Sequence, residues 1–94
     1  MIKMVISARL KKRVDKLPLE IRAAASEAIA NVAAAFGHPH KHGGLGLRKL
    51  GRYSCEVRAG IHWRVVFFLE GETMTAYDVM DHDEVRRWVR SQLK

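Results

Sequence analysis

The chain is a short, basic sequence whose length and composition exclude several classes of protein. It has 94 residues, of which 48% are hydrophobic, and this favours one folded domain over residues 1–94 rather than a disordered chain. Its longest wholly apolar runs have five residues, far short of the roughly 20 that a membrane-spanning helix needs. The single cysteine, Cys55, excludes an internal disulfide framework and fits a reducing cytoplasm. The net charge of +7 favours a polyanionic partner.

The charges are segregated along the chain. Residues 1–36 carry seven basic and three acidic residues, and residues 37–64 carry six basic residues, one acid and four of the five histidines. Residues 65–85 carry six acids and no base, whereas residues 86–94 carry four bases and no acid. The basic excess therefore lies before residue 65 and in the last segment.

The first half of the chain is predicted to form a strand and two helices. Residues 2–6 are apolar at four of five positions, as in a short strand. Ser7 can cap a first helix over residues 8–16, and Pro18 suits the first turn of a second helix. Alanine, isoleucine and valine then recur at helical spacing until Gly37, which is a natural end for this helix. The many alanines allow close packing, and we expect the two helices to form an antiparallel hairpin.

Three strands are predicted in the second half. Residues 53–58 alternate between apolar and polar side chains, as in a strand with one wet face. Residues 61–69 become apolar on both faces towards their end, which is typical of a central strand. Residues 73–80 form the third strand, in which Tyr77 and Val79 should share a face.

A final helix is predicted over residues 84–93. Asp81 or Asp83 can cap its N-terminus, Trp88 and two valines can pack it, and its other positions are mainly basic. The resulting order is β-α-α-β-β-β-α. This order predicts an α+β fold, with the helix hairpin packed on a small, mainly antiparallel, twisted sheet.

Basic side chains gather on one face of the predicted hairpin. We take the register in which Arg58 lies opposite His62 and Glu56 opposite Arg64, because a slip by one residue would break the apolar pattern. These side chains then share the open face of the sheet, joined from upstream by Lys49 and Arg52. Arginine forks bind phosphate oxygens bidentately, but a solvated face with weak surface ion pairs explains the pattern equally simply.

Four segments match the pattern of a known family. Leu47–Gly51 contains K-L, Tyr53–Gly60 ends with R-A-G, and His62–Phe67 reads H-W-R-V-V-F. Asp78–Arg87 contains H-D-E-V. Together with the order of elements, this pattern resembles the RelE/ParE superfamily, the toxins of type II toxin–antitoxin modules. The resemblance covers about residues 45–90 by motif and implies a RelE-like fold.

The resemblance also implies an activity, the cleavage of mRNA in the ribosomal A site. In this reaction a ribose 2′-hydroxyl attacks the adjacent phosphate, which requires a base, positive charge at the phosphorus and an acid for the leaving oxygen. By position, Arg64 corresponds to the contact with the scissile phosphate, and Arg58 and Lys49 to basic residues lining the site. His82 is the best candidate for the general acid or base, because imidazole titrates near neutral pH. Further RNA contacts are expected from Arg52, Arg48, His62 and Lys41.

The resemblance leaves the target open. The nuclease is expected to need no metal and no other cofactor, and its partners would be the ribosome, mRNA and a cognate antitoxin. ParE-like members instead poison DNA gyrase, and this chain has no tyrosine or histidine after His82, where some nuclease members carry one. A third possibility is a module that binds RNA or its antitoxin without activity. In each case an acidic, partly disordered antitoxin segment should cover the basic face in a hetero-oligomer.

Several remaining residues have plain structural explanations. Asp81, Asp83 and Glu84 could bind magnesium, but acids also favour a helix N-terminus. Cys55 points inward, as an inert thiol would, and the two tryptophans suit the core. One cluster of histidines could chelate a metal, although a solvated loop is simpler because no carboxylate or cysteine is near in sequence. This cluster comprises His38, His40 and His42.

Overall fold

The computed structural model describes residues 3–35 and 47–92, so Lys41 and the histidine cluster lie outside the described residues. In chain order, the described residues form β1 (Lys3–Ile6), α1 (Ala8–Val14), α2 (Leu19–Ala35), β2 (Arg48–Lys49), β3 (Ser54–Ala59), β4 (Trp63–Glu70), β5 (Thr73–Asp81) and α3 (His82–Gln92). The predicted α+β architecture is confirmed. The short strand β2 is an addition, because two residues are too few to show a period in sequence. Among the described helices, none is long and apolar enough to cross a membrane.

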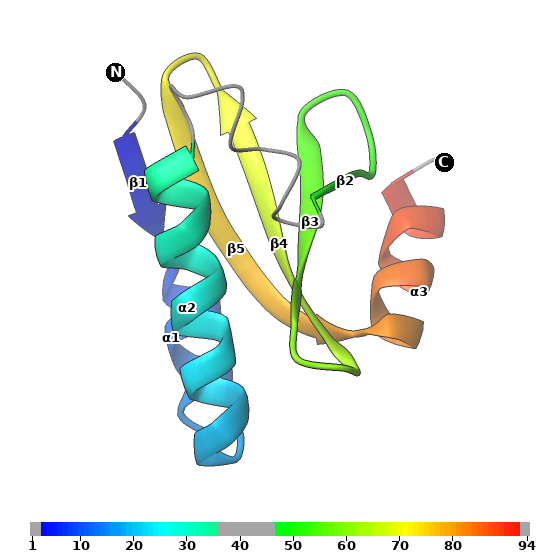
Figure 1. Ribbon diagram of the computed structural model, residues 1–94. Helices are drawn as coiled ribbons and strands as arrows, with labels where there is room; N and C mark the ends of the chain where they lie inside the picture. The colour runs from blue at the N-terminus through cyan, green and yellow to red at the C-terminus, as the bar shows by residue number, and fades with distance from the viewer. Residues whose placement is uncertain (1–2, 36–46, 93–94) are drawn as a thin grey trace.

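The strands form a single twisted sheet with β4 at its centre (Figure 1). Their order is β1-β5-β4-β3-β2, in which β1 is parallel to β5 and every other neighbouring pair is antiparallel. The central place of β4 was predicted from its apolar character on both faces, because a central strand with covered faces has no wet side. The strands β1 and β2 therefore mark opposite edges of the sheet.

The larger core lies between the two N-terminal helices and one face of the sheet. Val32 of α2, Val65 and Phe67 of β4 are fully buried there. Ala25 and Ala28 are also buried in this core, and their small side chains let α2 approach the strands closely. In Figure 1, α1 and α2 run in opposite directions, as predicted for a hairpin.

The other face of the sheet is covered in part by α3, which corrects the prediction of an open face. Val66, Met80 and Val85 are buried in a second, smaller core, against which Trp88 and Val89 of the helix pack. An amphipathic helix with valines and a tryptophan on one side must bury that side, and this sheet face is where it does so. The predicted packing role of Trp88 is confirmed.

Two pairing details differ from the sequence prediction. Arg58 lies opposite Arg64, and Glu56 lies opposite Val66, so the register is shifted by two residues from the predicted one and keeps the same faces. His62 lies in the turn between β3 and β4 rather than within a strand. The shift follows from the position of the turn, which lies one residue later than predicted, over residues 60–62, because Gly60 takes a positive φ of 79° and the strand β4 begins only at Trp63.

A bulge in β5 makes a third prediction wrong, that Tyr77 and Val79 share a face. The register between β4 and β5 slips between Val66 and Phe67, which face Asp78 and Ala76 respectively. Tyr77 is thus the extra residue of the bulge. It packs with the smaller core, whereas Val79 belongs to the larger one.

Candidate functional site

A small basic cleft lies between β2 and α3. It has a volume of about 230 Å³. Its polar lining comes from Arg48, Lys49, Glu56, His82, Arg86 and Arg90. Four of these side chains are lysine or arginine and one is an imidazole, so the cleft has the charge that binds an anion.

Helical spacing explains why α3 supplies half of this lining. His82, Arg86 and Arg90 are four residues apart, so they lie above one another along one side of the helix. Val85 and Val89 follow the next side, where they pack towards the smaller core. The cationic side chains therefore stand at the edge of a buried face, which orients them over β2.

A buried carboxylate, that of Glu56, lies at the cleft. Its residue is 5% exposed, and its Oε1 atom lies 3.8 Å from Arg48 Nη1 and 4.0 Å from Arg64 Nε. Its Oε2 atom is buried and has no hydrogen-bond partner in the described part of the chain. The pairing of β2 with β3 places Arg48 directly opposite Glu56. Glu56 thus links a cleft arginine to the strand arginine.

The guanidinium of Arg64 is turned towards the backbone of the β3–β4 turn. Its Nη1 atom donates to the carbonyl oxygens of Trp63, at 3.0 Å, and Ile61, at 3.4 Å. The side chain is 13% exposed and does not line the cleft. Arg64 therefore adjoins the cleft through Glu56 rather than standing within it.

His82 is the first residue of α3, and the capping of this helix determines its position. The N–H of Glu84 donates to Asp81 Oδ1 at 2.8 Å, and the N–H of Asp81 donates to Glu84 Oε1 at 3.3 Å, which forms a capping box. The N–H of His82 donates to the carbonyl oxygen of His62 at 3.2 Å. These bonds confirm Asp81 as the cap and hold His82 against the β3–β4 turn.

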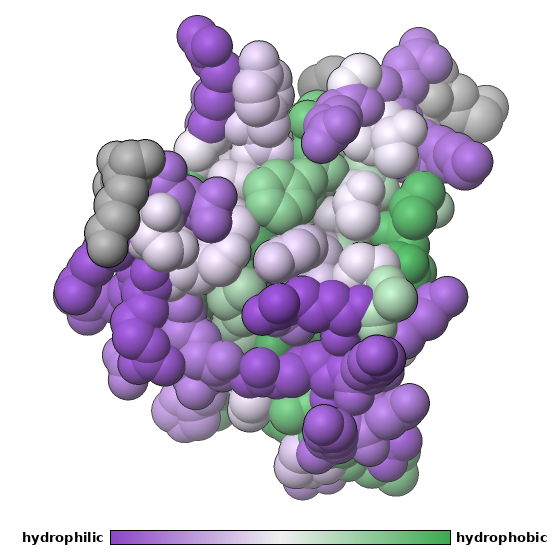
Figure 2. Space-filling view, turned by 180° about the vertical axis from the view of Figure 1, so that it is seen from behind, coloured by the Kyte–Doolittle hydropathy of each residue, from purple (hydrophilic) through white to green (hydrophobic). Residues whose placement is uncertain are grey.

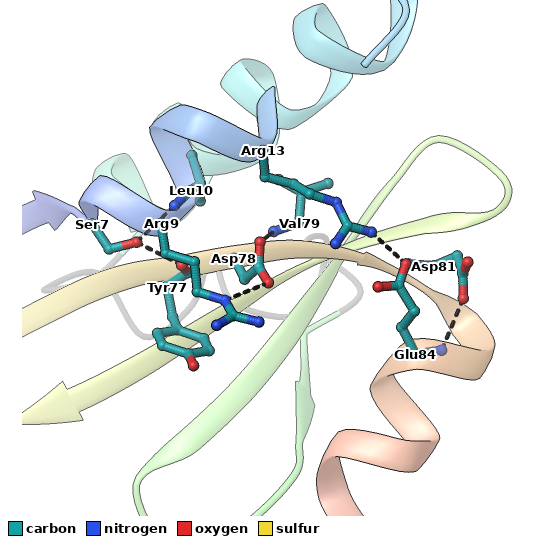
Figure 3. A network of polar contacts seen from close by, with 9 residues as sticks. All are labelled: Ser7, Arg9, Leu10, Arg13, Tyr77, Asp78, Val79, Asp81 and Glu84. Atoms are coloured by element: carbon teal, nitrogen blue, oxygen red, sulfur yellow. Dashed lines mark hydrogen bonds and ion pairs between the residues drawn. The ribbon is translucent and has the colours of Figure 1, made fainter. Parts of the chain in front are cut away.

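A polar network ties α1 to the same region (Figure 3). Arg13 Nη2 donates to Glu84 Oε1 at 2.5 Å, so α1 supports the first turn of α3. Nearby, Arg9 Nε donates to Asp78 Oδ2 at 3.0 Å, and this bond raises the pKa of the Arg9 guanidinium. Arg9 also lies over the ring of Tyr77, 5.3 Å from its centroid. The ion pair between Arg13 and Glu84 therefore links the helix hairpin to the helix that lines the cleft.

The structure brings together some of the predicted site residues and separates others. Lys49, Arg48 and His82 line the cleft. Arg58 instead borders a hollow beside α2, and Arg52 borders a different groove near the β2–β3 turn. Three polar residues that the sequence did not assign to the site also line it, namely Glu56, Arg86 and Arg90. The four-residue spacing from His82 was the signal for the two arginines, whereas nothing in the sequence pattern indicated that Glu56 would be buried.

The chemistry of other candidate residues is limited. Burial, and to a lesser extent the neighbouring Glu56, raises the pKa of the Cys55 thiol to about 11, so this thiol is poorly nucleophilic near neutral pH. Within residues 3–35 and 47–92, no three His, Cys, Asp or Glu side chains are grouped as a metal site would require.

The comparisons with known proteins support the fold. No protein-family model and no curated protein matches the chain. Among solved structures, it is similar to the RelB–RelE antitoxin–toxin complex from Methanococcus jannaschii, with a TM-score of 0.66 and 13% identity. The match covers 89% of this chain and 96% of the matched one. At this identity the likeness concerns the fold, which is consistent with the RelE-like architecture that the sequence predicted.

Proposed function

We propose that the chain is the toxin of a type II toxin–antitoxin module and acts as a ribosome-dependent mRNA endoribonuclease. The observation that carries this proposal is the basic cleft between β2 and α3, with His82 at its lining, on a RelE-like fold. A polyanion is the natural occupant of such a cleft, and the chain's net charge of +7 has the sign that attracts it. The cognate antitoxin would supply an acidic segment that occupies the cleft when the toxin is silent.

The cleft residues can divide the reaction among them. Arg86 and Arg90 would hold the phosphate oxygens, and Lys49 would stabilise the charge that develops on the phosphorane. His82 would transfer a proton, either from the attacking 2′-hydroxyl or to the departing 5′ oxygen. The products would be a 2′,3′-cyclic phosphate and a free 5′-hydroxyl, and the proton lost by the first oxygen balances the one gained by the second.

Induced expression in a bacterium tests this function. The wild-type chain should arrest growth and cleave ribosome-bound mRNA, as mapped by primer extension, and co-expression of the product of the neighbouring small open reading frame should restore growth. His82→Ala should lower the cleavage rate by about 10²–10⁴-fold, the range for one general acid or base. Arg87→Ala is the matched control, because Arg87 is on the same helix and exposed, and does not line the cleft.

Unchanged cleavage in both His82→Ala and the double variant Arg86→Ala/Arg90→Ala would contradict the proposed site. These variants change exposed side chains, so their folding can be verified by circular dichroism before the comparison.

The position of Arg64 favours one second candidate, a ParE-like inhibitor of DNA gyrase without nuclease chemistry. Its guanidinium is occupied by two carbonyl oxygens and lies near Glu56, so the strand arginine is withdrawn from the cleft. Pulse-labelling separates the two functions. If protein synthesis stops first, the nuclease is supported, whereas an early stop in DNA synthesis with intact mRNA supports gyrase inhibition.

A further inference from the structure

A second and larger hollow, mainly apolar, lies beside the basic cleft. It has a volume of about 760 Å³, and its apolar lining includes Leu50, Tyr53, Phe68, Trp88 and Val89. We call this hollow the aromatic groove. Leu50 and Val89 line both hollows, so the groove and the cleft adjoin across these two side chains.

The helix α3 forms a wall of both hollows. His82, Arg86 and Arg90 face the cleft, whereas Trp88 and Gln92, which are also four residues apart, face the groove. Val89 lies between these two rows of side chains. One helix therefore presents cations to one hollow and an aromatic ring with an amide to the adjoining one.

Two aromatic side chains of the groove, those of Phe68 and Trp88, are held in place by ring packing. The rings of Phe68 and Trp88 pack edge to face with centroids 5.5 Å apart, and Phe68 packs against Tyr77 at 5.1 Å. Tyr53, in the turn between β2 and β3, also lines the groove and is 62% exposed. Figure 2, which views the molecule from behind, shows pale and green surface in the middle of that face with hydrophilic surface beside and below it. The packed rings of Phe68 and Trp88 can bind a flat partner with little further loss of freedom, and Tyr53 adds an exposed ring beside them.

We infer that the aromatic groove binds a base of the same single-stranded RNA whose phosphates occupy the basic cleft. The inference rests on the proposed function and names an additional subsite. A positive groove beside exposed aromatic faces is the usual arrangement for binding single-stranded nucleic acid, because the backbone follows the cations while the bases stack on the rings. Arg52 and Glu70 both line the groove and balance each other in charge, so it is the cations of the adjoining cleft that favour an anionic chain as the occupant.

Binding of a short single-stranded RNA to the purified chain tests the subsite. The probe is one oligonucleotide, compared with a set of copies in which a single abasic nucleotide is placed at each position in turn. One position should weaken binding by about 5- to 150-fold when the base is missing, the range for one stacked base. Tyr53→Ala should cause a loss in the same range and remove the difference between the intact and abasic probes, whereas Tyr53→Phe should retain both.

The salt dependence of binding distinguishes the subsite from the phosphate cleft. Tyr53→Ala should leave the slope of log K against log salt unchanged, whereas Arg86→Ala should reduce it by about 0.7, the value for one phosphate contact in a single strand. If the wild type binds RNA and Arg86→Ala weakens it, while abasic probes and Tyr53→Ala bind normally, the groove is not a base site and the proposed function stands. If Tyr53→Ala impairs binding of the antitoxin but not of RNA, the groove docks a protein and the inference is wrong. If the wild type neither binds nor cleaves RNA, the proposed function itself fails.

Discussion

At the scale of single residues, the cleft combines cations with one carboxylate that is almost fully buried. Glu56 neutralises part of the charge of Arg48 and Arg64, and its second oxygen has no hydrogen-bond partner within the described residues. A negative charge beside a phosphate opposes binding, yet a carboxylate between two guanidinium groups also orients them. Glu56 should therefore weaken the binding of a phosphate in the cleft while it keeps the two arginines in place.

Glu56→Gln separates these two effects, because it removes the charge and keeps the shape. We expect it to strengthen binding of a short RNA roughly fivefold, as the nearby negative charge is lost, while mRNA cleavage becomes slower because the arginines lose their common partner. Binding and cleavage are measured on the same protein preparation. Glu20→Gln, an exposed change in the first turn of α2, is the control for the change in net charge. Weaker RNA binding in Glu56→Gln would mean that orientation of the arginines matters more than repulsion.

At the scale of elements, the positions of the functional side chains depend most on how α3 begins. This helix holds His82, the two cleft arginines and Trp88, so its capping box positions both hollows. The hydrogen bond that the N–H of Glu84 donates lowers the pKa of the Asp81 carboxyl. Since the folded-state pKa lies below the unfolded value, the charged cap stabilises the fold above about pH 4, and this stabilisation is lost as the pH falls through the folded-state pKa.

Asp81→Ala should lower the free energy of unfolding by about 1 kcal/mol at neutral pH, the usual cost of losing an N-cap. The difference from the wild type should shrink in acid, because the protonated wild-type carboxyl no longer caps as a charge. Urea unfolding at neutral pH and in acid measures both expectations. Asp83→Ala, two residues later in the first turn of the same helix, should cost less. An equal loss in the two variants would indicate that general acidity at the helix N-terminus, rather than the cap, stabilises α3.

At the scale of the whole molecule, the sheet separates two basic surfaces. The cleft adjoins β2 at one edge, and α1 packs against β5 near the other edge. Two arginines of α1 are engaged by Asp78 and Glu84, whereas its neighbours Lys11 and Lys12 are exposed. Under the proposed function, a long nucleic acid such as ribosomal RNA would contact both edges of the sheet, whereas a short oligonucleotide would occupy the cleft alone.

The double variant Lys11→Gln/Lys12→Gln tests this division of the charge. It should weaken association with ribosomes several-fold and make that association less sensitive to added salt than in the wild type. Binding of a short RNA to the cleft should stay unchanged. Co-sedimentation with ribosomes and oligonucleotide binding give the two readouts. If ribosome association and oligonucleotide binding weaken together, the charges of α1 and of the cleft attract RNA jointly and the proposed division is wrong.

Local patterns in the sequence determined most of the elements of this fold. Ser7 was predicted as a cap, and its Oγ accepts the N–H of Leu10 at 3.0 Å. The alternation of β4 and the alanine face of α2 likewise predicted a central strand and a closely packed helix, because periodicity records which side of an element is buried. The family motif, which is also local, predicted the RelE-like architecture.

Only the tertiary structure decided which charged side chains meet. The bulge at Tyr77, the register that pairs Arg58 with Arg64, and the cover that α3 provides all depend on contacts between segments distant in sequence. The sequence by itself determined that the chain is basic and that its charge is segregated. It also predicted Lys49 and His82 as residues of one site, and the structure places both at the lining of the same cleft. The sequence could not show that Arg86 and Arg90 complete the cleft, or that Glu56 is buried beside it, because spacing along a chain does not specify what packs across a sheet.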